Sequence, residues 1–304
     1  MTTVSGPRGL SELAPEELGE QVLNAWDGFL DVADASDLAL PSRLPRWTGL
    51  DTCMHLGAWE DHAPLEAIVA SARSGGAGEP PRPDDSNARL LAAHRDASRE
   101  QVLAGLVRAR DAMEAFFGSA PARELGRVPA RSSLGPLPVL TLVHASCYEL
   151  AVHALDLAPC GAPPPPPQLL DRGLAALLDV TGALACRAGT HVDVTAQAPS
   201  GGWAFRSDPQ GWTTRSTASG RFDGTGVRGA AADLLDASAG RAALPQLLLT
   251  RRLVVQDLPS FLRLAPLVHE LPGLPGGAAL RSGVAGLSAV TGGVNRVLGR
   301  LGRR

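Results

Sequence analysis

A glutamate and a histidine four residues apart, in an otherwise apolar segment, are the clearest chemical signal in the chain. Glu149 and His153 lie within Tyr148-Glu149-Leu150-Ala151-Val152-His153. On a helix, side chains at this spacing point the same way. A buried carboxylate and imidazole need a compensating partner, and a divalent cation serves both. From this pattern alone, either a metal site or a hydrogen-bonded Glu–His pair remains open.

A histidine in a second apolar segment, Cys53-Met54-His55-Leu56, favours the metal. A lone histidine on an apolar face is usually a core residue. Here a facing helix would complete two histidines and one glutamate, the ligand set of open catalytic zinc sites. We therefore predict one zinc-type ion, with ligand bonds of about 2 Å, held by His55, Glu149 and His153.

Other polar residues near these positions have open or structural roles. Asp156, three residues beyond His153, could orient an imidazole or simply be a polar helix end. His62 could line the pocket, but a solvated histidine is expected because Glu60 and Asp61 adjoin it. His144 is expected to be structural. Two cysteines nearby are expected to be small buried hydrophobes: Cys53 and Cys147.

Composition is that of a soluble globular protein, with 44% hydrophobic and 19% charged residues among 304. All 28 basic side chains are arginine, and the net charge of −3 gives no general reason to expect nucleic acid as a partner. No uncharged apolar stretch reaches the roughly 18 residues of a transmembrane helix, and no secretory signal opens the chain. We expect a cytoplasmic protein with reduced cysteines.

Four segments with apolar residues at three- and four-residue steps predict helices, and together a four-helix bundle over residues 1–160. They are residues 11–36, 50–73, 87–118 and 138–158. Pro64 could kink or split the second. Facing helices of such a bundle are where metal sites are built.

The proline run at 163–167 predicts a semi-rigid linker, residues 161–167, before a second domain. Residues 168–273 read as an α+β domain with a small, mainly antiparallel sheet. Helices are expected at 168–187, 229–241 and 258–271, with strands around 190–197, 202–207, 211–218 and 251–257. We expect every strand to lie after residue 188.

The tail, residues 274–304, spaces four apolar residues seven apart: Leu280, Leu287, Val294 and Leu301. A basic amphipathic helix that touches a partner or membrane surface is conceivable. Because the stretch is also rich in glycine, which weakens helices, a tail without a special role is the expectation.

Two segments resemble a known superfamily. Arg46–Leu56 is similar to the "gW…dv..Hl" signature of the DinB/YfiT-like metalloproteins, and Glu149–Asp156 to their "E..vHa.D" signature. The two-domain build resembles the mycothiol-dependent maleylpyruvate isomerase family of actinobacteria, which adds a domain similar to sterol carrier proteins. Ala232–Arg241 is similar to that domain's "dLl.l..GR" helix end.

The resemblance implies that His55, Glu149 and His153 bind the metal and that mycothiol is the thiol cosubstrate. A metal-bound thiolate can add to an electron-poor double bond, which makes an isomerase, or displace a leaving group, which makes an S-transferase. Arg241 is expected to hold an anionic substrate or the cofactor, or else to cap a helix end. The site leaves two other classes open: a metal hydrolase that uses zinc-bound water, and a non-catalytic metal- or thiol-binding protein.

Overall fold

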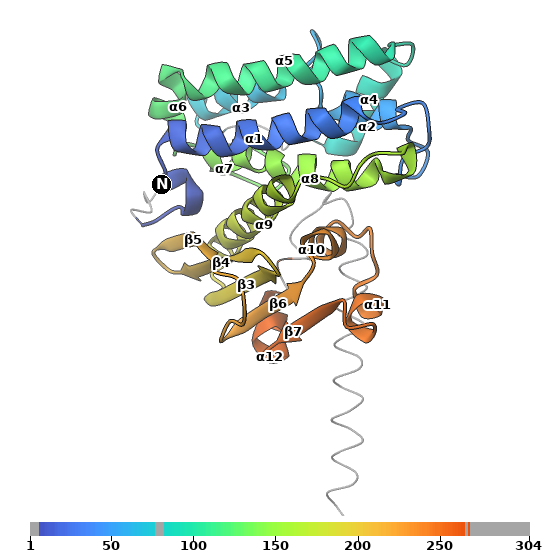
Figure 1. Cartoon of the computed structure of the whole chain (residues 1–304). Helices are drawn as coiled ribbons and strands as arrows, with labels where there is room; N and C mark the ends of the chain where they lie inside the picture. The colour runs from blue at the N-terminus through green and yellow to red at the C-terminus, as the bar shows by residue number, and fades with distance from the viewer. Residues whose placement is uncertain (1–5, 77–81, 265–266, 268–304) are drawn as a thin grey trace, which may run out of the picture.

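The computed structural model describes residues 6–76, 82–264 and 267. A helical half lies above a sheet in Figure 1, and helix α9 runs between the two. The predicted tail, 274–304, lies outside the described residues. In the ranges that the structure describes, no helix is long and apolar enough to span a membrane.

The secondary structure of the first half of the chain consists mainly of helices joined by loops. Its helices are α1 (Pro15–Asp34), α2 (Gly49–Leu56), α3 (Pro64–Arg73), α4 (Pro83–Ala93), α5 (Arg99–Phe117), α6 (Ala120–Leu125), α7 (Val139–His144) and α8 (Ser146–Asp156). α1 contacts α5 and α8, and α2 contacts the same two helices. The side chains of α2 and α8 therefore meet inside the helical half.

Three of the four predicted helices are divided in the structure. Pro64 does split 50–73, since it opens α3 after the break that follows α2. The single helix predicted at 87–118 is wrong: α4 ends at Ala93, and Ser98 opens α5 through a capping box with Gln101. The segment 138–158 bends at Ala145, between α7 and α8.

The expectation that every strand follows residue 188 is also wrong. Two two-residue strands, β1 (Pro129–Ala130) and β2 (Leu137–Pro138), pair antiparallel just before α7. Gly135, at φ 86°, and the Ser132 hydroxyl, which donates to the Gly135 carbonyl oxygen, reverse the chain between them.

The second half contains a five-stranded sheet in the order β5-β4-β3-β6-β7. Its strands are β3 (Val192–Ala198), β4 (Gly201–Asp208), β5 (Gly211–Thr217), β6 (Thr225–Gly229) and β7 (Leu253–Gln256). Only β3 and β6 pair in parallel, and the other neighbours are antiparallel. The sheet is thus mixed, with the antiparallel majority that the sequence predicts, but β6 itself was not predicted.

Two helices lie between β6 and β7 in the sequence, α10 (Ala231–Ser238) and α11 (Leu244–Leu249), and α12 (Leu258–Phe261) follows β7. α11 was not predicted. Of the helix predicted at 258–271, the structure describes α12, a 3-10 turn at Leu262–Leu264, and Leu267, which is helical.

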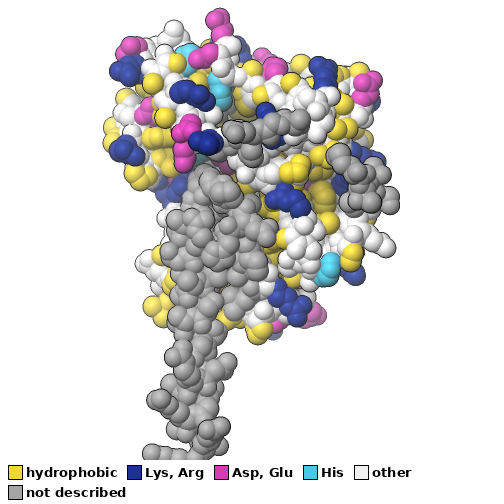
Figure 2. All heavy atoms as spheres, turned by 180° about the vertical axis from the view of Figure 1, so that it is seen from behind, with side chains coloured by type: hydrophobic (Ala, Val, Ile, Leu, Met, Phe, Trp, Pro, Cys, Tyr) yellow, Lys and Arg dark blue, Asp and Glu magenta, His cyan; other side chains and the backbone are white. Residues whose placement is uncertain are grey.

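α9 (Pro167–Arg187) connects the halves. It begins at the last proline of the predicted linker, packs against α8 and α1, and also lies on β4 and β5. One continuous hydrophobic cluster includes residues of both halves. The division into domains at the prolines stays a prediction. Across the middle of the rear face, hydrophobic side chains are exposed where the halves meet (Figure 2).

Candidate metal centre

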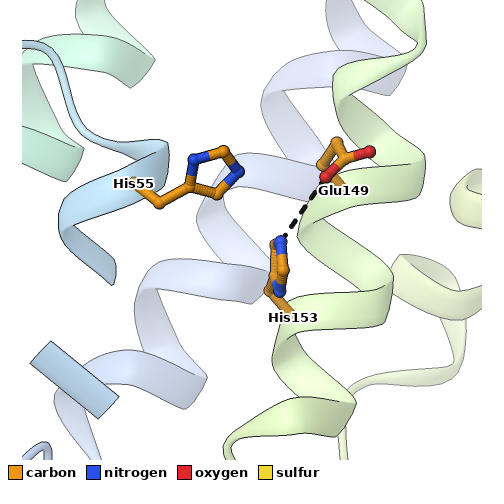
Figure 3. Close-up of side chains that lie close together, drawn as sticks. All are labelled: His55, Glu149 and His153. Carbon is orange, nitrogen blue, oxygen red and sulfur yellow. Dashed lines mark ion pairs between the residues drawn. The ribbon is translucent and has the colours of Figure 1, made fainter. Parts of the chain in front are cut away.

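The three predicted ligands come together between α2 and α8. One donor atom from each of His55, Glu149 and His153 lies within 4.8 Å of the others. In Figure 3 the His55 ring projects from α2 toward the two α8 side chains. Nε2 of His153 lies 3.4 Å from Oε2 of Glu149, and the two imidazole rings meet edge to face at 5.4 Å. The sequence therefore identified three side chains that converge.

Local structure explains how α2 presents its histidine. Thr48 and Asp51 form a capping box that fixes the start of the helix, and His55 lies in its last turn. Trp47 packs beside the His55 ring at 5.6 Å between centroids. On α8 the i, i+4 spacing alone places Glu149 and His153 on one face.

His153 is oriented by a carboxylate. Its Nδ1 donates to Oδ2 of Asp156 at 3.0 Å, which leaves Nε2 facing Glu149. Asp156 is fully buried, and burial raises its pKa, but the bonds from His153 and Arg241 outweigh this and lower it. Burial alone would lower the pKa of His153; the bonds to Asp156 and Glu149 raise it to about 9. Of the two roles left open for Asp156, the structure shows the orienting one.

His55 is oriented by a neutral amide instead. Its Nδ1 donates to Oδ1 of Asn87, on α4, at 3.0 Å. In the described ranges, its Nε2 has no hydrogen-bond partner and faces the other two ligands. Burial, and then the neighbouring His153, lower the pKa of His55 to about 4, so its ring is neutral at physiological pH.

These atoms fit a divalent cation. Both imidazoles use Nδ1 for an outer acceptor and leave Nε2 for a ligand bond, which is how metal-binding histidines are usually held. Tetrahedral zinc, with bonds near 2.1 Å, places neighbouring ligand atoms roughly 3.4 Å apart. The 3.4 Å between His153 and Glu149 meets this value, and His55 needs only a small shift. A hydrogen-bonded pair of Glu149 and His153 alone would not explain why Nε2 of His55 also faces these two residues.

The sheet half also reaches this centre. Arg241 follows Gly240, whose φ of 67° ends α10. Its Nε donates to Oδ1 of Asp156 at 2.9 Å and its Nη2 to Oδ2 at 3.0 Å, while Nη1 donates to the Ala239 carbonyl oxygen. Arg241 therefore caps the end of α10 and also lines the cavity, and its predicted role in holding an anionic substrate or the cofactor stays a prediction. Its main contact, a buried ion pair behind His153, was not predicted.

Two more contacts hold α10 against the helical half. Arg43 forms a bidentate ion pair with Asp236, with both N–O distances at 3.0 Å. Tyr148, next to the ligand Glu149, shares a hydrogen bond of 3.1 Å with Ser238. The position of Arg241 is thus fixed by neighbours on both sides.

A cavity of about 530 Å³ opens beside the three ligands. Arg241, Asn87 and His62 lie in its wall, in addition to the ligands themselves. His62 is half-buried there, so the expectation of a solvated residue holds only in part. The volume is within the usual range for small-molecule sites.

The remaining candidates lie away from the ligand set. Cys53 and Cys147 are fully buried, and burial raises the pKa of each thiol to about 12, so both are inert hydrophobes. His144 is buried with neither ring nitrogen partnered in the described structure, and burial lowers its pKa to about 3. Asn87 was missed because one amide in a polar helix gives no sequence signal.

Part of the chain matches a known family. Residues 20–158 match the family described as the mycothiol maleylpyruvate isomerase N-terminal domain. The crystal structure of the mycothiol-dependent maleylpyruvate isomerase is 19% identical, with a TM-score of 0.45, and the match covers 80% of this chain and 93% of that one. A histidine-to-alanine mutant of that enzyme gives 17% identity and a TM-score of 0.46 over the same shares. None of the curated proteins matches this chain.

Proposed function

We propose, from the match of residues 20–158 to the mycothiol maleylpyruvate isomerase N-terminal domain family, that this chain is a metal-dependent enzyme that uses mycothiol. Its substrate is an electrophilic small molecule, and its reaction is cis–trans isomerisation or S-transfer. His55, Glu149 and His153 hold the ion, with zinc the best fit to two imidazoles and a carboxylate.

One observation carries the proposal. Two imidazoles from different helices each donate a hydrogen bond from Nδ1 to an outer acceptor, and the Nε2 atom of each faces one carboxylate. Without a metal, His153 holds a proton on Nε2 that faces Glu149, because hydrogen bonds to Asp156 and Glu149 raise its pKa to about 9. A cation that displaces this proton would meet two imidazole nitrogens and a carboxylate at a common point beside a cavity, and it would replace the proton's positive charge.

The chain's own residues would divide the work as follows. Asp156 keeps the proton on Nδ1 of His153, and Asn87 does the same for His55. Arg241 keeps Asp156 ionised and presents the remaining N–H bonds of its two terminal nitrogens to a substrate carboxylate or to the cofactor. The apolar cavity wall limits the access of water, which would compete with the thiol.

When bound, the metal lowers the pKa of a coordinated thiol, so that a thiolate is present at neutral pH. A thiolate that adds to an alkene carbon pushes the π electrons onto the conjugated carbonyl. Rotation and expulsion of the thiolate then return the trans alkene and the free thiol. Displacement of a leaving group, which departs with its electron pair, would instead leave the new C–S bond in the product.

The same family supports the finer architecture that we propose. Residues 1–160 form a DinB-like four-helix bundle, built on α1, α2, α5 and α8, and 161–167 form the linker. Residues 168–273 form a sterol-carrier-like domain that contributes Arg241. We assign the protein to the cytoplasm, where mycothiol would be available.

The test is thiol-dependent turnover by the full-length, zinc-loaded protein. Maleylpyruvate is the probe, assayed with mycothiol, with a thiol-free control and without protein. Isomerisation that needs protein, metal and thiol together supports the proposal. Turnover of the probe or of an ester without thiol would indicate the hydrolase instead. Metal and thiol binding with no turnover of any electrophile would indicate a binding protein.

A further inference from the structure

The cavity beside the ligands has a mostly apolar wall. Leu56, Ile68, Met113, Leu177 and Val180 are among its lining residues, and they come from α2, α3, α5 and α9. Polar side chains also line the cavity, and they include the three ligands, Asn87 and Arg241. A bound molecule therefore meets polar groups at the metal centre and mainly apolar surface elsewhere.

Charge in the wall is unfavourable to a substrate with two carboxylates. Among the described residues that line the cavity, Arg241 is the one arginine, and it is already paired with Asp156. Besides the ligand Glu149, two acidic residues line the same cavity: Glu66 and Asp84. The described lining residues therefore offer no second permanently charged cation for another anionic group.

We infer that this site takes a predominantly apolar electrophile with no more than one anionic group. The inference rests on the thiol chemistry proposed above. It separates this chain's substrate from maleylpyruvate, whose two carboxylates would leave one unpaired against an apolar or acidic wall.

Half-esters of maleic acid test the inference directly. Each is a cis-alkene with one carboxylate, an ester carbonyl and an alkyl chain of chosen length, from methyl to hexyl. Each added methylene that enters the cavity should raise kcat/KM about 3–4-fold, until the cavity is filled. The assay uses the full-length, zinc-loaded protein with mycothiol, and maleylpyruvate serves as the dianionic comparison.

A cavity-wall variant provides the matched control. Ala112 is a half-buried lining residue of α5, whereas Ala115, three residues on, is exposed. Ala112→Leu should lower kcat/KM for the hexyl ester by at least 10-fold, because the larger side chain occupies the space that the alkyl chain would fill. The dependence of kcat/KM on chain length should then be weaker than in the wild type. Ala115→Leu should leave the series unchanged.

The outcomes separate this inference from the proposed function. Thiol-dependent turnover in which maleylpyruvate surpasses every half-ester, with no effect of chain length, overturns the substrate class but leaves the enzyme. If nothing turns over, the proposed function fails. Calorimetric measurement of half-ester binding to the same protein then tests the proposed substrate class independently of turnover. Affinity that rises with chain length supports this class, and equal affinities overturn it.

Discussion

The metal centre and the cluster around Asp179 are both buried polar sites, but one brings together ligand atoms for a cation and the other brings together hydrogen-bond donors. At the centre, one ligand atom from each of His55, Glu149 and His153 lies within 4.8 Å of the others. At the other site, Asp179 of α9 receives donors: Leu10 N at 2.9 Å, Trp212 Nε1 at 3.0 Å and Thr214 Oγ1 at 2.7 Å.

All three donors reach Oδ1 of Asp179, and its Oδ2 has no partner among the described residues. The carboxylate ties the N-terminal segment to β5 of the sheet. The fit is tight, since a Cβ on Gly9 would come 1.9 Å from Oδ1, and Gly9 has a φ of 59°. A surplus of donors around one acceptor builds an anchor, whereas a surplus of acceptors beside a cavity calls for a cation.

The largest expected effect is on metal content. His153→Ala removes a ligand, so the purified variant should lose the roughly one zinc per chain expected of the wild type, together with all thiol-dependent turnover. Elemental analysis and circular dichroism would show lost metal in a folded protein. His62→Ala, which changes another cavity histidine, should retain the metal. Full zinc occupancy in His153→Ala would remove this residue from the ligand set.

Asp179→Ala should show the reverse pattern, with stability lost and metal kept. Three buried donors would be left unsatisfied, at a cost of about 3 kcal/mol in the free energy of unfolding. Urea denaturation measures the loss, and Asp193→Ala, at an exposed position on β3, is the control. A variant that lost zinc while its stability was unchanged would contradict the distinction between the two sites.

Asp156→Asn should weaken zinc binding by about 10–100-fold, because His153 loses its charged acceptor and Arg241 its ion partner. Competition with a chelator measures the affinity. Asp236→Asn breaks a comparable arginine pair at the same interface without touching a ligand, so its zinc affinity should stay near that of the wild type. Equal losses in both variants would mean that Asp156 acts only through the interface.

A smaller loss, about 10-fold in zinc affinity, is expected for Asn87→Ala, since a neutral amide supports its histidine less strongly than a carboxylate does. Asn87→Asp, by copying the Asp156 arrangement, should bind zinc at least as tightly as the wild type. Ser86→Ala, one residue away, serves as the control. Weaker binding by Asn87→Asp would show that charge at this position is not what orients His55.

The smallest effect is a difference in pH dependence. Burial raises the pKa of Asp179 above its ordinary value of 3.8, against the opposing hydrogen bonds. The folded state thus holds this proton more tightly than the unfolded chain, so its contribution to stability is present at low pH and lost as pH rises through the folded pKa. The free energy of unfolding of the wild type and of Asp179→Asn can be compared from acidic to neutral pH. The stability of the variant relative to the wild type should increase as the pH rises. A constant difference would mean that Asp179 keeps its ordinary pKa.

Much of the candidate site could be predicted because part of it is local. Four-residue spacing alone placed Glu149 and His153 on one helix face, and a three-residue step brought Asp156 within reach of the same imidazole. Apolar periodicity located most helices and most strands of the sheet. The break before Ser98 was missed because apolar residues continue at helical spacing across it, whereas the capping box favours a new start.

Other features depended on residues far apart in the chain. The convergence of His55 with α8 required the packing of two helices, and Asn87 and Arg241 reached the histidines from α4 and from the end of α10. β6, which has a glycine at two of its five positions, is a strand because β3 and β7 pair with it on either side. Sequence alone determined what neighbouring residues along a helix or strand impose on one another. Only the tertiary structure decided which distant side chains meet, because that depends on the packing of the whole core.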